Sequence, residues 1–227
     1  MKIIFTVLLC YFITFSSAQT IQLLDSNNAI SIRGLCTVDD NIIWASGSRG
    51  TVARSINGGK SFEWIKVKGY EQRDFRDIEA FDKNTAIIIA VDTPAIILKT
   101  IDGGITWKKV FEDKRAGMFL DAMSFWNSNS GIVVGDPIDG KLFIARTFDG
   151  GTTWRGLPQA NYPAAEKGEA MFAASGTNVA LLNKQEAVFV TGGALSRLFI
   201  RDEKIVLPII QGQEFTGANS IAVYDEK

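Results

Sequence analysis

A glycine-rich octapeptide occurs three times in this chain at nearly constant spacing. It reads TIDGGITW at 100–107 and TFDGGTTW at 147–154, and a looser copy, SINGGKSF, lies at 55–62. The acidic or amide position moves from Asn57 to Asp102 to Asp149, in steps of 45 and 47 residues, and the aromatic position keeps the same steps. Copies in register at a fixed period indicate a structural repeat, so the fold must be built from units of about 45 residues.

Each unit contains four short apolar runs, as the second unit illustrates. Its runs are FRDIEAF at 75–81, TAIIIAV at 85–91, AIILKT at 95–100 and TWKKVF at 106–111. They are rich in β-branched and aromatic residues and show no helical period, which predicts strands. Four strands in about 45 residues are typical of one blade of a β-propeller. The sequence therefore predicts an all-β propeller of four-stranded antiparallel blades.

The blades are expected at residues 29–67, 73–111, 117–157 and 168–210, with the start of a fifth at 216–227. In the fourth unit the expected strand-forming runs are 168–175, 186–193 and 196–209, and the turn RDEK at 201–204, within the last run, stands in place of the octapeptide. The repeat accounts for about four and a half blades, whereas closed propellers have about four to eight whole ones. We therefore expect an incomplete ring, the N-terminal part of a longer propeller.

The octapeptide pattern S/T-x-D-G-G-x-T-W resembles the Asp-box, or BNR repeat, of sialidases, sortilin-type receptors and photosystem II assembly factor-like propellers. The FRDI…AF…DGGITW order of the second unit is most similar to the last group, which also occurs as exported proteins in non-photosynthetic bacteria. The resemblance covers about residues 29–225. It implies a propeller of about seven blades, and it says little about function because the motif is shared by unrelated activities.

The residue types of the octapeptide predict a scaffold role. Gly103 and Gly104 allow the positive φ angles of a tight turn, Asp102 can accept the N–H groups of that turn, and Trp107 can pack between sheets. Asn57 in the acidic position favours this interpretation, because an amide accepts the same bonds but is a poor proton donor or calcium ligand. The residues assigned to the three turns are Ser55, Asn57, Gly58, Gly59 and Phe62; Thr100, Asp102, Gly103, Gly104 and Trp107; and Thr147, Asp149, Gly150, Gly151 and Trp154.

The first 18 residues read as a signal peptide. Lys2 precedes an apolar stretch that ends at Phe15, and small residues up to Ala18 follow it. We expect export to the periplasm or medium after cleavage near Ala18, with no membrane span in the remaining chain; an uncleaved anchor is the alternative. Cys36 is then the only cysteine, so no internal disulfide is possible.

Composition excludes several classes of chemistry. The chain has no histidine, which excludes Ser-His-Asp and Cys-His catalysis and any His-ligated metal within it. Its net charge of −1, from 24 basic and 25 acidic residues, shows no footprint of nucleic-acid binding. No nucleotide or iron–sulfur motif is present. We expect no cofactor, no metal and no catalytic residue.

Candidate site residues lie on the first strand of each unit, which lines the central channel of a propeller. They are Arg33, Arg76, Asp77, Asp121 and Glu169. Charged groups on central strands need partners or a wet cavity. Two interpretations remain open: recognition of a ligand or partner at the channel mouth, or Arg–Asp pairs that merely close the ring.

Three functions compete. The resemblance implies a non-catalytic exported propeller that binds a protein or helps to assemble a complex. A sialidase-like glycoside hydrolase, with a glycan as ligand, is the first alternative. The segment SIRGL faintly resembles the arginine motif of sialidases, but Gly34-Leu35 replaces the Ile-Pro of that family and no tyrosine lies in a recognisable motif. An oxidoreductase, as such propellers are sometimes labelled, is the second.

Overall fold

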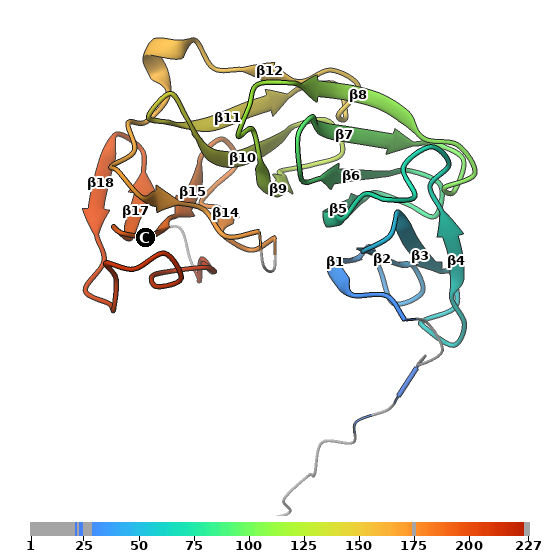
Figure 1. Cartoon of the computed structure of the whole chain (residues 1–227). Coiled ribbons are helices and arrows are strands. Elements are labelled where there is room, and N and C mark those ends of the chain that lie inside the picture. The colour runs from blue at the N-terminus through green and yellow to red at the C-terminus, as the bar shows by residue number, and fades with distance from the viewer. Residues whose placement is uncertain (1–20, 22, 25–28, 174–175, 225–227) are drawn as a thin grey trace, which may run out of the picture.

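The computed structural model describes residues 21, 23–24, 29–173 and 176–224, and within them the chain is all-β apart from one turn of 3-10 helix, η1 (Gln159–Asn161). Four four-stranded antiparallel sheets follow one another along an arc, as blades of a propeller whose ring is open (Figure 1). No helix among the described residues is long and apolar enough to cross a membrane. The expected signal peptide lies outside the described residues.

The first three blades run in simple sequence order from the inner to the outer strand. Blade 1 consists of β1 (Ile32–Thr37), β2 (Ile43–Gly47), β3 (Thr51–Ser55) and β4 (Glu63–Lys66); blade 2 of β5 (Phe75–Ala80), β6 (Ala86–Ala90), β7 (Ala95–Thr100) and β8 (Lys108–Asp113); and blade 3 of β9 (Leu120–Phe125), β10 (Gly131–Ile138), β11 (Lys141–Thr147) and β12 (Arg155–Gly156).

The hydrophobic core lies between the blades rather than within one of them. Strand β6, AIIIA, is buried along its whole length because both of its faces pack on a neighbouring blade. Such a strand is expected to be apolar at every position instead of alternating. Three clusters of buried side chains result, one at each interface between successive blades. Packing of each blade on the next therefore holds the arc together.

Blade 4 departs from the prediction. Its sheet is formed by β14 (Val179–Leu181), β15 (Ala187–Val190), β17 (Arg197–Ile200) and β18 (Glu203–Val206). The expected inner strand 168–175 is wrong over the described residues 171–173. Only β13 (Glu169–Ala170) pairs, with β16 (Gly192–Gly193) in a separate two-stranded sheet, and the inner strand of the four-stranded sheet begins at Val179 instead. We call the described residues between β13 and β14, 171–173 and 176–178, the inner loop.

The expected fifth unit forms no strand over its described residues, 216–224. This segment instead folds back onto blade 4. Gly217 makes an isolated bridge with Gly192, and the backbone N–H of Ile221 donates to the Thr177 carbonyl at 2.8 Å. The segment thus contacts β16 and the inner loop.

Candidate functional site

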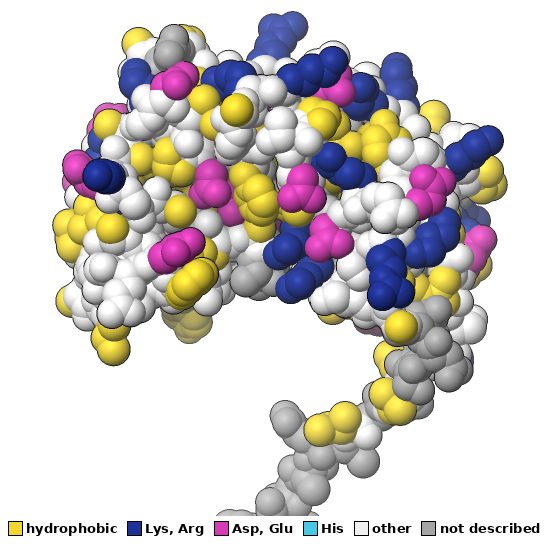
Figure 2. Space-filling view, in the orientation of Figure 1, with side chains coloured by type: hydrophobic (Ala, Val, Ile, Leu, Met, Phe, Trp, Pro, Cys, Tyr) yellow, Lys and Arg dark blue, Asp and Glu magenta, His cyan; other side chains and the backbone are white. Residues whose placement is uncertain are grey.

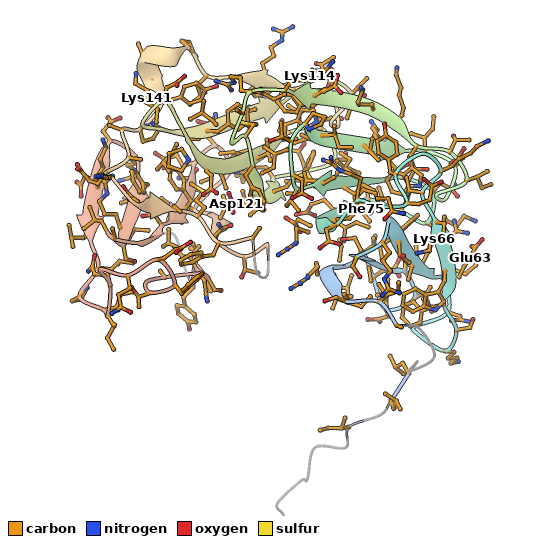
Figure 3. The ribbon with its side chains drawn as sticks, in the orientation of Figure 1. Glu63, Lys66, Phe75, Lys114, Asp121 and Lys141 are labelled. Carbon is orange, nitrogen blue, oxygen red and sulfur yellow. The ribbon has the colours of Figure 1, made fainter. Side chains whose placement is uncertain are left out.

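The inner strands of blades 2 and 3 bring two aspartates to the concave edge of the arc, where Figure 3 shows Asp121. Asp77 on β5 is 7% exposed, and its carboxylate accepts the backbone N–H of Ile78 at 2.8 Å and that of Met123 at 2.7 Å. Met123 belongs to β9, so this side chain fastens blade 2 to blade 3. Burial, and then the nearby charge of Glu79, raises the pKa of Asp77 well above its ordinary value.

Asp121 on β9 is fully buried, and neither of its oxygens makes a hydrogen bond of acceptable geometry among the described residues. Burial raises the pKa of Asp121 well above its ordinary value, and the charge of Asp136 adds to this effect while Arg76 opposes it. Because a buried charge is costly, burial favours the neutral acid, while the backbone N–H groups of Asp136 and Ala173 favour the carboxylate.

The two candidate arginines retain unused donors. Arg76 donates from Nη1 to the Ala173 carbonyl of the inner loop at 3.3 Å, and its Nη2 lies 3.7 Å from Asp74 Oδ2. The Nε atoms of Arg76 and of Arg33 are buried and have no hydrogen-bond partner among the described residues. Basic and acidic side chains lie side by side on this concave face (Figure 2). The ion pair of Arg76 is with Asp74, just before its own strand, and its hydrogen bond to Ala173 joins blade 2 to the inner loop.

Glu169, also expected at the channel mouth, lies inside blade 4. It forms an ion pair with Arg197, whose Nε donates to Glu169 Oε1 at 2.9 Å. The Thr191 hydroxyl and the Glu166 backbone N–H complete its hydrogen bonds, at 2.5 and 2.8 Å. All of its acceptors are therefore used within the blade, and it does not join the arginines.

The octapeptide turns are stabilised internally. In the second, the Thr100 hydroxyl accepts the backbone N–H of Gly104 at 3.0 Å and donates to Asp102 Oδ1 at 2.8 Å. That carboxylate also accepts the N–H of Thr106 at 2.9 Å and its hydroxyl at 2.5 Å, which lowers the pKa of Asp102. The same contacts hold Asn57 and Asp149 in their turns, and they lower the pKa of Asp149 to about 2. The hydrogen bonds of these groups are thus made within their own turns.

The glycines and tryptophans of the turns sit on the preceding blade. Both glycines of the second octapeptide have positive φ, 78° and 90°, and a Cβ atom on Gly104 would lie 3.6 Å from the Trp44 ring of blade 1. Trp107 packs in the core between blades 1 and 2, and Trp154 in the core between blades 2 and 3. The second and third octapeptides thus each seal one interface between blades.

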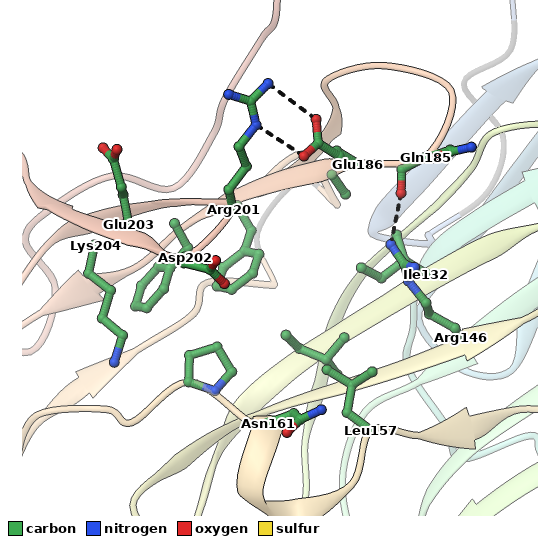
Figure 4. A pocket seen from close by; sticks show the side chains of 15 residues that line it. Ile132, Arg146, Leu157, Asn161, Gln185, Glu186, Arg201, Asp202, Glu203 and Lys204 are labelled. Carbon is green, nitrogen blue, oxygen red and sulfur yellow. Dashed lines mark hydrogen bonds and ion pairs between the residues drawn. The ribbon is translucent and has the colours of Figure 1, made fainter.

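The interface between blades 3 and 4 holds a cleft of about 600 Å³ (Figure 4). Its apolar walls come from both blades, and charged side chains surround its opening. The lining residues used below are Ile132, Arg146, Gln185, Ala187, Phe189 and Phe199. Sequence reasoning did not single out this cleft, although the replacement of the octapeptide at 201–204 was a signal for it.

Other groups gain structural explanations. Burial raises the pKa of the Cys36 thiol to about 11 and that of Glu79 to about 7, so the thiol is protonated and a poor nucleophile. Tyr162, in the long segment between blades 3 and 4, packs 5.9 Å from the Phe143 ring. Among the described residues, no three Cys, Asp or Glu side chains are grouped so that they could hold a metal ion.

No protein-family model matches the sequence, and no curated protein sequence matches it. Solved structures do match. YCF48 bound to a D1 peptide has a TM-score of 0.56 and 20% identity over 82% of this chain and 55% of its own. YCF48 from Cyanidioschyzon merolae has a TM-score of 0.56 and 15% identity over 82% and 58%. A GH74 enzyme from Niastella koreensis has a TM-score of 0.50 and 14% identity over 73% and 28%. The chain spans just over half the length of the YCF48 structures, and these likenesses show a propeller fold alone.

Proposed function

We propose that this chain is part of an exported, non-catalytic propeller of the Asp-box type that binds another protein, in the manner of an assembly factor. The observation that carries the proposal is the pair of arginines on neighbouring inner strands, Arg33 and Arg76, whose buried Nε donors lack partners among the described residues. A buried donor without an acceptor costs free energy. Both side chains are half-buried, and a carboxylate or backbone carbonyl from a bound polypeptide would form charge-assisted bonds with the exposed part of each guanidinium group.

Two further facts support a binding role. The carboxylates that could be suspected of catalysis are either buried, as in Asp77 and Asp121, or bonded within their own turns, as in Asp102. A structure with the same fold, YCF48, has been solved with a peptide of another protein, D1. We carry peptide binding over to the present chain as a hypothesis, on the concave face.

The test is selection of binders from a random peptide library on the purified protein, followed by affinity measurements on the selected peptides. We expect acidic peptides whose affinity falls at least about tenfold, or about 1.4 kcal/mol, in the variant Arg33→Gln/Arg76→Gln. The matched control, Lys108→Gln/Arg155→Gln, removes two exposed charges from outer strands and should bind as the wild type does. Equal binding by both variants would contradict the proposal, and so would release of a fluorophore from a sialic-acid conjugate.

We also propose export, based on the apolar N-terminal segment and the small residues that end it at Ala18. Expression of the whole gene product in a Gram-negative host should yield a periplasmic protein beginning at Gln19. N-terminal sequencing checks this. A protein that keeps Met1 and sediments with membranes would instead indicate an anchor.

A further inference from the structure

The cleft between blades 3 and 4 lies where the other two interfaces hold an octapeptide. Trp44, Ile87 and Ile132 are each the second residue of the second strand of their blade, in β2, β6 and β10. The octapeptide of blade 2 places Gly104 on Trp44, and that of blade 3 places Gly151 against Ile87. Ile132 is the next in this series. Blade 4 offers it no octapeptide, and Ile132 lines the cleft instead.

The backbone acceptor for the missing octapeptide is still in place. In blades 2 and 3 the first glycine of the octapeptide donates its N–H to a carbonyl of the first turn of its own blade: Gly103 to Asn84 at 2.9 Å and Gly150 to Asn129 at 2.8 Å. Each acceptor stands two residues after the Asp or Asn side chain that caps this turn. In blade 4 the capping residue is Asn183, so the equivalent carbonyl is that of Gln185.

The side-chain donor for the missing octapeptide also remains. The residue just before the Ser or Thr that opens each octapeptide is basic: these residues are Arg54, Lys99 and Arg146. Lys99 reaches to the next blade and donates to the carbonyl of Gly150 at 2.7 Å. Arg54 donates instead to a carbonyl in the first turn of the next blade, that of Lys83, at 2.7 Å. Arg146 does the same in blade 4, where it donates to the Gln185 carbonyl at 3.1 Å. Its guanidinium carbon also lies 5.0 Å from the centre of the Trp126 ring, and the side chain lines the cleft (Figure 4).

Apolar residues form the floor of the cleft, and polar and charged side chains make up about half of its lining. Ile132, Phe189 and Phe199 are 4, 6 and 4% exposed there, and the two phenylalanine rings stack 4.7 Å apart on the blade 4 side. At the interface between blades 2 and 3 the corresponding core contains Trp154, which meets the Phe125 ring edge-on at 5.8 Å. Aromatic side chains favour such edge and offset contacts. The volume of about 600 Å³ lies within the range of small-ligand sites, and it exceeds what one unfilled side-chain position leaves.

We propose that this cleft binds a tryptophan side chain presented on a polar turn of a partner protein. The floor at Ile132 and the Phe189–Phe199 stack take the indole, while Arg146 and the Gln185 backbone carbonyl bind the backbone of the turn. The partner's turn thereby completes the interface between blades 3 and 4 in the way that the chain's own octapeptides complete the others. This site is separate from the concave face, and neither proposal depends on the other.

The probe is the chain's own sequence TIDGGITW, closed into a ring through added terminal cysteines so that the turn is preorganised, and labelled with fluorescein. Fluorescence anisotropy with the full chain should show saturable binding. The matched probe TIDGGITA, which lacks only the indole, should bind at least about tenfold more weakly. Absence of binding by the first probe, or equal binding of the two, would overturn the proposal.

Two variants locate the binding. Ala187→Trp fills the cleft from a half-buried position in its wall, and it should abolish probe binding while the protein keeps its wild-type circular dichroism spectrum. Replacing residues 201–204 by TIDGGITW should also abolish binding and should raise the melting temperature. Binding that persists in a folded filled variant would place the probe elsewhere and refute the site. If light scattering shows a dimer that Ala187→Trp converts into a monomer, the occupant is a second copy of this chain and the proposal of a different partner is wrong.

Discussion

Replacing Thr100 with valine removes one hydroxyl and little volume from the second octapeptide turn. The Thr100 side chain is 1% exposed, and its hydroxyl accepts the N–H of Gly104 at 3.0 Å and donates to Asp102 at 2.8 Å. Gly104 is itself buried against blade 1, so water cannot replace the lost acceptor. A buried N–H without a partner costs about 1–3 kcal/mol, and the added methyl group recovers less than about 1 kcal/mol. We expect a net loss of about 1–2 kcal/mol.

Urea denaturation followed by tryptophan fluorescence measures this loss as a lower midpoint with an unchanged slope. For a domain of this size, 1 kcal/mol corresponds to about 2–4 °C in Tm, so thermal unfolding gives an independent value. The matched control is Thr106→Val in the same turn, where the side chain is exposed and water can replace the lost bonds; its stability should stay within about 0.5 kcal/mol of wild type. If Thr100→Val were as stable as wild type yet failed to bind peptides, the turn would be a functional site and our reasoning would be refuted.

Three further perturbations follow from buried groups. The pKa of Glu79 is raised from 4.5 to about 7 in the fold. The folded protein therefore holds this proton more tightly than the unfolded chain, and the stability that results is lost as the pH rises from about 4.5 through 7. Urea titrations should show a fall of up to about 3 kcal/mol in the unfolding free energy over this range, and Glu79→Gln should flatten it. Glu169→Ala leaves the buried Arg197 charge unpaired and should cost about 3–5 kcal/mol in urea, most of which the double variant with Arg197→Met should restore. Gly34→Ala places a Cβ atom 2.8 Å from the Ile78 backbone nitrogen, and calorimetry should show a loss of about 1–3 kcal/mol; an unchanged melt would mean that blades 1 and 2 can separate at no cost.

The period of the octapeptide was sufficient to predict the architecture, because turn, strand and inter-blade packing are all encoded within each repeat. Local chemistry also predicted the hydrogen bonds of Asp102 correctly, since its partners are residues 100 and 106 of the same turn. The hydrogen-bond partners of Glu169 could not be predicted in this way. Its ion-pair partner, Arg197, lies 28 residues away in the sequence, beyond the reach of any local pattern.

The inner loop and the cleft have the same origin in blade 4, the unit that departs most from the repeat. In blade 2 the inner strand has only a register shift, between Phe75 and Asp77, whereas in blade 4 the inner loop takes the place of the expected strand. No local sequence pattern predicts where this loop lies on the concave face. The cleft follows from a missing segment. A missing segment becomes visible only when the equivalent positions of the other blades, such as Trp44 and Ile87, are known to be covered.

A methyl NMR titration is the most direct test of the role of the octapeptides. In this account, an octapeptide closes the interface between two blades and its absence opens a binding site. Ile87 and Ile132 occupy the same position in neighbouring blades, the first covered by Gly151 and the second facing the cleft. Their Cδ1 methyl signals can be assigned with Ile87→Val and Ile132→Val. On addition of the unlabelled cyclic TIDGGITW probe, we predict a progressive ring-current shift of the Ile132 signal and no change at Ile87. A silent Ile132, or equal shifts at both positions, would contradict the account.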